Sequence, residues 1–215
     1  MKFLYSLSGA NVPVIKEFDT YTNEVVNAGD VVFLDIAGKV TKNFTNTVIG
    51  VCAETHSGKE DILNERSNKN KIRVDVTMGG VYEAEGVNVE AAQDCANNSF
   101  VCSADKLNTT FDGAKIVLVK KAEGSLNTDP VGTVRDVNGG MYNDGMINFT
   151  ISNGSNISKG DVYTFYPAIG AQGSVSEGSN VIDFSNSTAA KVKVVGHDIK
   201  RGKLDVMFCS KVFEN

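Results

Sequence analysis

The clearest pattern in the chain is a two-residue alternation of apolar and polar side chains. Between Ile72 and Met78 the even positions are apolar and the positions between them are polar, which is the period of a strand with one buried face. The segment Val48–Ala53 is instead apolar throughout, as is typical of a strand covered on both faces. The sequence therefore predicts short strands.

Further segments of this kind are bounded by Gly, Asn and Asp, which favour tight turns. The other expected strands are Val31–Ile36, a short one from Val40, Ile116–Val119, Val131–Val137, Met146–Ile151, Val162–Tyr166, Val181–Phe184, Ala190–Val195 and Leu204–Phe213. One short helix is expected at Val89–Ala96. The predicted fold class is all-β, with short-stranded barrel or sandwich modules and one short helix.

Three turn signals refine this expectation. Gly79-Gly80 predicts a bulge or bend within a strand that continues to Glu83. The Asn138-Gly139-Gly140 region predicts a turn between two strands, and Asn153-Gly154 predicts a hairpin. Each of these three predictions can be tested against the order of the strands in the folded protein.

Two long stretches share their features in the same order. Gly29–Glu83 and Gly160–Glu214 each span 54 positions (83 − 29 and 214 − 160), open on Gly-Asp-Val and close on a hydrophobic-aromatic-Glu triplet. A duplication would give two related subdomains, residues 1–124 with the first copy and the short helix, and residues 125–215 with the second copy. The alternative is two unrelated β-meanders with the same turn chemistry.

The composition is that of a globular protein, with 41% hydrophobic and 22% charged residues in 215. A net charge of −5 argues against a protein that holds bare nucleic acid, because phosphate neutralisation needs a surplus of Lys and Arg. The apolar run near Met1 is too short for a signal peptide, and no stretch is long enough to span a membrane. We therefore expect synthesis in a cytoplasm, without direct nucleic-acid or membrane binding.

Cysteine and histidine spacing does not indicate a metal site or a cofactor. The four cysteines, Cys52, Cys95, Cys102 and Cys209, contain no Cys-x-x-Cys pair. Cys95 and Cys102 could close a disulfide loop, although free packed thiols are expected in a reducing cytoplasm. A dyad of Cys52 with His56 is disfavoured because Cys52 lies in an apolar strand. No catalytic residues are therefore expected.

Two charged features have structural interpretations. Asp30 and Asp161 follow glycines at strand starts, where a carboxylate can accept backbone N–H groups and lock the turn. A basic cluster is formed by Lys191, Lys193, Lys200, Arg201 and Lys203. It is expected to be a solvated strand face, and the alternative is contact with an acidic partner.

The order of motifs in the first stretch resembles a known family. The motifs are Ala28-Gly29-Asp30-Val31-Val32, Val48–Ala53, Gly58-Lys59-Glu60-Asp61, Ile72–Val76 and Gly80-Val81-Tyr82-Glu83. This order is similar to that of tailed-bacteriophage head decoration and capsid-fibre proteins. The resemblance implies a non-enzymatic β-rich protein on the exterior of a virion, which binds the major capsid protein of the same particle, stabilises the shell and forms a homo-oligomer.

Attachment is assigned to the N-terminal segment, where apolar residues precede the first well-defined strand. These partner-contact candidates are Phe3, Leu4, Tyr5, Val12 and Val14. Two alternatives remain: a tail-tube or fibre component, and, in a different class, a cytoplasmic enzyme or ligand-binding β-domain that uses Cys52, His56 or His197.

Overall fold

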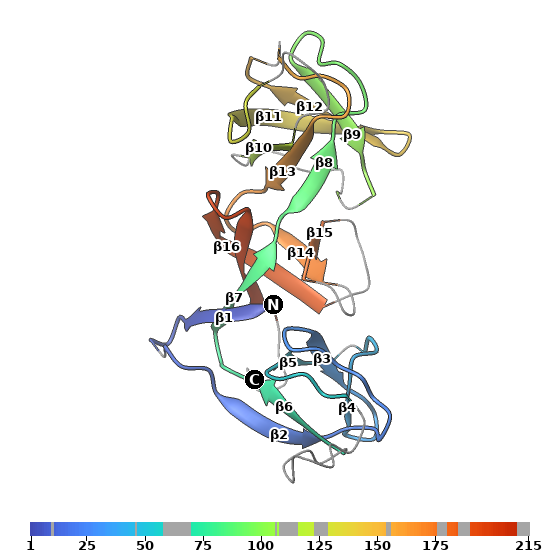
Figure 1. The fold of residues 1–215 in the computed structure, drawn as a ribbon, viewed down its shortest axis with the longest axis vertical. Coiled ribbons are helices and arrows are strands. Elements are labelled where there is room, and N and C mark those ends of the chain that lie inside the picture. Colours follow the sequence, from blue (N-terminus) through green and yellow to red (C-terminus); the bar gives the residue numbers. More distant parts are fainter. Residues whose placement is uncertain are drawn as a thin grey trace.

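Figure 1 shows the computed structural model as three sheets that follow one another along the long axis of the molecule. The structure describes residues 1–9, 11–45, 47–57, 70–105, 107, 116–122, 129–153, 156–175, 180–184 and 190–209. Strands β1 to β17 form these sheets, and the described residues contain no helix. The predicted all-β class is therefore confirmed.

The lower sheet in Figure 1 has five strands in the order β2-β6-β5-β3-β4. They are β2 (Ile15–Asp19), β3 (Val31–Leu34), β4 (Val40–Thr41), β5 (Val48–Cys52) and β6 (Lys71–Asp75). All of the neighbouring strands pair antiparallel. This sheet is built from one continuous stretch of the chain.

The central sheet has six strands in the order β1-β7-β17-β16-β14-β15. They are β1 (Lys2–Ser6), β7 (Gly80–Glu85), β14 (Gln172–Val175), β15 (Ile182–Asp183), β16 (Ala190–Asp198) and β17 (Lys203–Phe208). Residues from both ends of the chain therefore meet in one sheet.

The upper sheet has six strands in the order β8-β13-β10-β11-β12-β9. They are β8 (Val87–Glu90), β9 (Ser99–Ser103), β10 (Ile116–Ala122), β11 (Val134–Asn143), β12 (Met146–Ile151) and β13 (Val162–Tyr166). Its two edges approach each other, since the Ala92 N–H donates to the Val101 carbonyl oxygen at 2.8 Å. The sheet thus curls most of the way around its own core.

The three sheets are nested in sequence. The lower sheet lies between β1 and β7, and the upper sheet lies between β7 and β14. Gly86 alone joins β7 to β8, and a Cβ there would lie 2.6 Å from Cγ2 of Thr164. Only glycine therefore fits where the chain passes from the central to the upper sheet.

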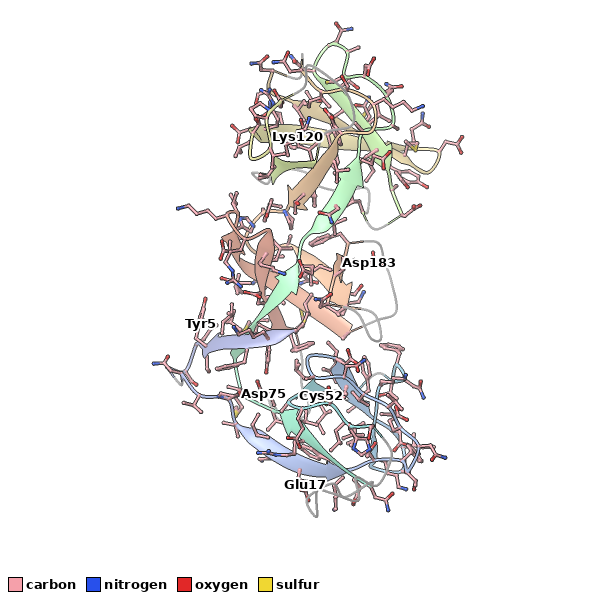
Figure 2. All side chains as sticks on the ribbon, in the orientation of Figure 1. Tyr5, Glu17, Cys52, Asp75, Lys120 and Asp183 are labelled. Carbon is pink, nitrogen blue, oxygen red and sulfur yellow. The ribbon has the colours of Figure 1, made fainter. Side chains whose placement is uncertain are left out.

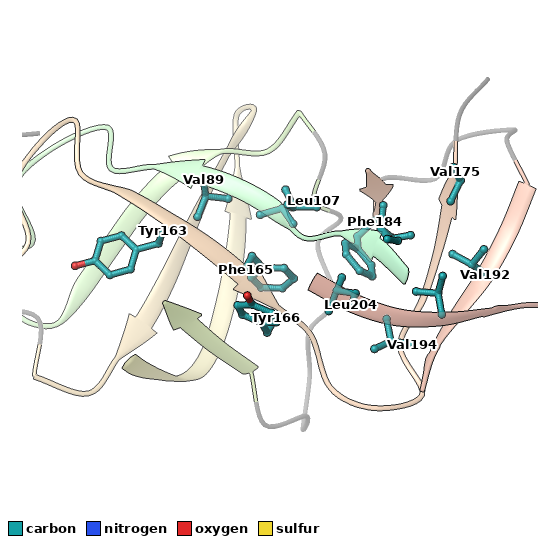
Figure 3. Close-up of a cluster of buried hydrophobic side chains, with 14 of the residues drawn as sticks. Val89, Leu107, Tyr163, Phe165, Tyr166, Val175, Phe184, Val192, Val194 and Leu204 are labelled. Atoms are coloured by element: carbon teal, nitrogen blue, oxygen red, sulfur yellow. The ribbon is translucent and has the colours of Figure 1, made fainter. Parts of the chain in front are cut away.

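One hydrophobic core extends through all three sheets. It includes Phe33 of the lower sheet, Tyr82 of the central sheet and Phe165 of the upper sheet. Figure 3 shows the part that joins the upper and central sheets. The other face of the lower sheet has a separate core, to which Ile49 and Val74 belong. Strand β5 is buried at every position, so the prediction of a strand covered on both faces is confirmed.

The prediction of a helix at Val89–Ala96 is wrong. Val87 and Val89 point inward while Asn88 and Glu90 are exposed, and these residues form β8 along β13. β-branched residues in a two-residue period favour a strand. Pairing with β13 thus outweighs the weak helical tendency of the residues that follow.

Two turn predictions are also wrong, for topological reasons. Asn138-Gly139-Gly140 lies inside β11, where the register with β12 shifts, so these residues form a bulge. The turn falls at Asp144-Gly145, where both residues have positive φ. Asn153 does not begin a hairpin, because β12 and β13 are separated by β11 and β10; Gly154 lies outside the described residues.

Gly79-Gly80 has a larger role than a bulge. Strand β6 ends at Asp75 in the lower sheet, and β7 begins at Gly80 in the central sheet. Gly79 has a φ of 58°, a backbone conformation that glycine adopts without strain. The glycine pair therefore marks the passage between two sheets.

The predicted duplication is wrong, because the two stretches have different strand orders. The first places β3 to β6 in the lower sheet and β7 in the central sheet, whereas the second places β13 in the upper sheet and β14 to β17 in the central sheet. The predicted boundary at Gly124 lies outside the described residues. The strands before and after Gly124, β10 and β11, pair directly with each other in the upper sheet. The chain therefore stays in one sheet across the predicted boundary.

The shared feature of the two stretches is a local turn. Asp30 accepts the Asn27 N–H at 2.9 Å, and Asp161 accepts the Ser158 N–H at 3.0 Å. The preceding glycines both have positive φ. The predicted role of the two aspartates as turn locks is confirmed, and repeated turn chemistry accounts for the similarity of the sequences.

Candidate partner-binding surface

Two passages of the chain between the central and lower sheets lie side by side. One runs from β1 to β2, and the other runs from β6 to β7. The Leu7 N–H donates to the Gly79 carbonyl oxygen at 3.0 Å, and Ser6 Oγ donates to the Met78 carbonyl oxygen at 2.7 Å. These hydrogen bonds fix the N-terminal passage against the glycine turn.

A second set of hydrogen bonds holds the far end of this passage. The Val14 N–H donates to Thr77 Oγ1 at 2.8 Å, and the Val76 N–H donates to the Val14 carbonyl oxygen at 2.9 Å. Thr77 Oγ1 in turn donates to the buried carboxylate of Asp75 at 2.5 Å. The passage is therefore anchored at both ends while its side chains remain available.

Large apolar side chains are exposed along these two passages and at the end of β1. We call them the junction surface; they are Tyr5, Leu7, Val12, Val14 and Met78. Val12 is 73% exposed and Met78 is 57% exposed. Figure 2 shows Tyr5 at the margin of the molecule, where the central and lower sheets meet. Adjacent exposed apolar residues of this kind commonly mark an interaction site.

The predicted contact residues divide into two groups. Tyr5, Val12 and Val14 are exposed and belong to the junction surface. Phe3 and Leu4 are half-buried, and the Phe3 ring packs edge-on against Tyr82 at 5.9 Å between centroids. Phe3 therefore supports the central core.

Leu7 and Met78 belong to the junction surface but were missed by sequence reasoning. Met78 continues the apolar face of Ile72–Val76, which predicts burial. The strand ends at Asp75, however, so Met78 leaves that face and becomes exposed. The sequence gives only a weak indication that Leu7 belongs to an apolar surface, because Leu7 is a single apolar residue between two serines.

A second apolar hollow lies on the upper sheet. It has a volume of about 390 Å³ and is lined by Val101 of β9, by Met141 and Asn143 of β11, by Met146 and Asn148 of β12, and by Asp144 in the turn between β11 and β12. Met141, Asn148 and Val101 are opposite one another across the three strands, and Met141 is 74% exposed. We call this region the distal surface, because Figure 1 places the upper sheet at the other end of the molecule from the lower sheet.

Two residues of the predicted basic cluster, Arg201 and Lys203, form ion pairs. Arg201 lies 2.6 Å from Glu83 and 3.5 Å from Asp198, and Lys203 pairs with Glu85. Lys191 and Lys193 are on the exposed face of β16. These residues form a charged outer face of the central sheet, which agrees with the prediction of a solvated strand face.

Among the charged residues of this outer face, Asp205 is the one whose negative charge destabilises the folded protein. It is directly opposite Glu83 on the neighbouring strand. Burial raises the pKa of the Asp205 carboxyl, and the charges of Asp198 and Glu83 raise it further. The folded state therefore binds the Asp205 proton more tightly than the unfolded state does, and the contribution of this group to stability is lost as pH rises through its folded pKa.

Replacing Asp205 with Asn is therefore expected to stabilise the protein at neutral pH. The gain should be about 0.2–1 kcal/mol, the range for one cross-strand pair. Thermal unfolding at pH 7 should show a higher midpoint for the variant, and the difference should shrink at acidic pH, where Asp205 is protonated in both states. Glu83→Gln is the control, because it removes the same repulsion between Asp205 and Glu83 but also removes the ion pair between Glu83 and Arg201. A lower midpoint for Asp205→Asn at pH 7 would contradict the assignment.

The thiols and imidazoles are not arranged as a reactive pair. Cys52 Sγ donates to the Glu54 carbonyl oxygen at 2.9 Å, and burial raises the pKa of the Cys52 thiol to about 11. Nε2 of His56 is buried and has no hydrogen-bond partner among the described residues. Nε2 of His197 lies 2.6 Å from the Pro167 carbonyl oxygen. Cys52 and His197 thus make separate contacts, and Nε2 of His56 is hydrogen-bonded to neither of them.

Thiol labelling of the folded protein should follow exposure. Cys209 is exposed and should react first, whereas Cys52 and Cys102 are buried, and burial raises the pKa of the Cys102 thiol to about 12. Peptide mapping after brief treatment with a thiol reagent measures the order. Protein unfolded in denaturant, in which all four thiols should react, is the control. Rapid labelling of Cys52 in the folded protein would favour the enzyme alternative.

Cys95 and Cys102 are both thiols in the structure and are not bonded to each other. Among the described residues, no group of three or more His, Cys, Asp or Glu side chains is placed to hold a metal ion. Within the same residues, no helix has the length and apolarity needed to cross a membrane. None of the protein-family models, curated proteins or solved structures compared with this chain matches it.

Proposed function

We propose that this protein is a non-enzymatic structural component of a virion, which binds the outer face of an assembled bacteriophage capsid and stabilises it. The observation that carries the proposal is the junction surface, an exposed apolar region on an elongated protein with a continuous core. Four of the five motifs that resemble the head decoration family lie at strands β3, β5, β6 and β7, and the junction surface adjoins the passage from β6 to β7. The motif Gly58-Lys59-Glu60-Asp61 lies outside the described residues.

The arrangement of two surfaces suits a protein that bridges neighbouring subunits. The junction and distal surfaces lie at different levels of the molecule, and the core that links the sheets resists bending between them. A protein that binds only the assembled shell stabilises it by mass action. Two contacts on one rigid body, or on a homo-oligomer, raise the effective concentration of each contact. The proposed partner is the major capsid protein of the same particle.

The test is to heat particles with and without the protein and to follow genome release. Bound wild-type protein should raise the release temperature. Val12→Asp should weaken particle binding and reduce the protection, because it places a charge on the junction surface. Point substitution is preferable to deletion of residues 1–14, because β1 is a strand of the central sheet.

The matched control is Ile36→Asp, a fully exposed apolar residue in the turn between β3 and β4. It should bind and protect particles as wild type does. Equal release temperatures with and without the protein at full occupancy would rule out a stabilising role. Equal loss of binding in both variants would exclude the junction surface as the contact.

A tail-tube or fibre component is the second candidate, favoured by the end-to-end arrangement of the three sheets. Antibody labelling of intact particles followed by electron microscopy distinguishes the two. Label spread over the head supports the capsid proposal, whereas label confined to the tail supports the alternative.

A further inference from the structure

Lys120 and Asp161 meet inside the upper sheet. Lys120 belongs to β10, and Asp161 immediately precedes the neighbouring strand β13. Lys120 Nζ lies 2.7 Å from Asp161 Oδ2, and both side chains are 0% exposed. The Tyr163 ring lies beside the amine, with its centroid 5.8 Å from Nζ. Figure 2 labels Lys120 within the upper sheet. An amine and a carboxyl group are therefore held in contact away from water.

The surroundings fix both groups. The Ser158 N–H donates to the same Asp161 oxygen at 3.0 Å. Tyr163 OH donates to Asp129 Oδ2 at 3.3 Å, and Arg135 holds that carboxylate in a two-pronged ion pair. The tyrosine that lies beside Lys120 is thus itself held by a second buried ion pair.

We propose that Lys120 and Asp161 become joined by an isopeptide bond that the folded protein forms by itself. The Asp161 carboxylate takes a proton from the Lys120 ammonium along their contact. The neutral amine then attacks Cγ of Asp161, so that a C–N bond forms. A C–O bond breaks as the hydroxyl leaves with a second amine proton as water. The products are one amide and one water molecule, and no other reactant is needed.

Three features of the site favour this reaction. Permanent contact replaces a bimolecular encounter, which can raise the effective molarity to roughly 10⁵–10⁸ M for well-oriented groups. The Ser158 N–H donates to the Asp161 oxygen that contacts Lys120, so it holds the carboxyl group in place beside Nζ. The product amide also replaces two buried charges, which are costly to keep out of water. The inference is independent of the proposed function.

The experiment is mass spectrometry of the purified full chain under denaturing conditions. The intact mass should be lower than the sequence mass by one water molecule. After digestion, the peptide with Lys120 should be found joined to the peptide with Asp161, and trypsin should not cleave after Lys120. Lys120→Arg keeps a cation without a primary amine, and its mass should show no loss of water.

The chain offers a matched control. Lys71 Nζ and Asp19 Oδ1 are also 2.7 Å apart, but their side chains are 35% and 61% exposed, so no bond should form between them. A cyclised Asp144-Gly145 step would also lose water, but it would reopen in mild alkali and would leave the two peptides separate. A wild-type mass equal to the sequence mass, with free Lys120 and Asp161 peptides, would overturn the proposal even if the variant failed to fold.

Discussion

Replacing Lys120 with Met is expected to lower the free energy of unfolding by at least about 3–5 kcal/mol, because it leaves the buried Asp161 carboxyl without its partner whether the wild-type pair is ionic or joined as an amide. The methionine occupies similar space, but it leaves the Asp161 carboxylate without its cation at a position that is 0% exposed. Urea denaturation monitored by circular dichroism measures the loss.

Two variants isolate the cause of this loss. Lys71→Met removes the cation of the exposed pair with Asp19 and should cost much less stability, because ion pairs exposed to water contribute little. Lys120→Met combined with Asp161→Asn should recover part of the stability, because the amide is uncharged and can still accept the Ser158 N–H. Equal losses for Lys120→Met and Lys71→Met would contradict the buried role of Lys120.

Most of the strands could be predicted from the sequence. The alternation in Ile72–Val76 and the apolar run Val48–Cys52 report burial directly, since each side chain shows whether its face meets water. The Gly-Asp turns before Val31 and Val162 were also predicted correctly, because they depend on local hydrogen bonds. Strands and turns that depend on local side-chain chemistry could therefore be predicted from the sequence.

The assembly of the sheets could not be predicted in the same way. A two-residue period shows which face of a strand is buried, but it does not show which strand lies beside it. The two Gly-Asp-Val turns are alike locally and lead into different sheets, so their similarity indicated a duplication that the strand order contradicts. The pairing of β1 with β7 and of β7 with β17 joins residues far apart in sequence, for which a single sequence gives no signal.

The candidate surface was predicted in part for a similar reason. Phe3, Leu4, Tyr5, Val12 and Val14 were predicted as contact residues because they are apolar and precede the first well-defined strand, and of these only Tyr5, Val12 and Val14 are exposed. The buried position of Lys120 could not be predicted, because lysine is rarely buried and its charge predicts a solvent-facing position. Its partner, Asp161, lies 41 residues further along the chain (161 − 120), so only the folded structure places them together.

The Phe165 ring connects the upper and central sheets, and its replacement by Ala should both destabilise the protein and uncouple the two sheets. Phe165 stacks on Phe149 of the upper sheet at 5.6 Å between centroids and packs edge-on against Phe184, beside the central sheet, at 5.9 Å. Figure 3 shows Phe165 and Phe184 where the two sheets meet. Because the side chain is fully buried, its loss should cost about 3–5 kcal/mol.

Phe100→Ala is the matched control, because Phe100 is also buried but contacts Phe149 and Tyr163 within the upper sheet. Both variants should lose comparable stability in denaturant. In calorimetry, only Phe165→Ala should separate unfolding into two transitions, because it removes a contact between the two sheets whereas Phe100→Ala removes contacts within one sheet. A single sharp transition in Phe165→Ala would contradict a dominant role for Phe165 and would mean that the remaining contacts, such as Tyr166 of β13 with His197 of β16, suffice to couple the two sheets.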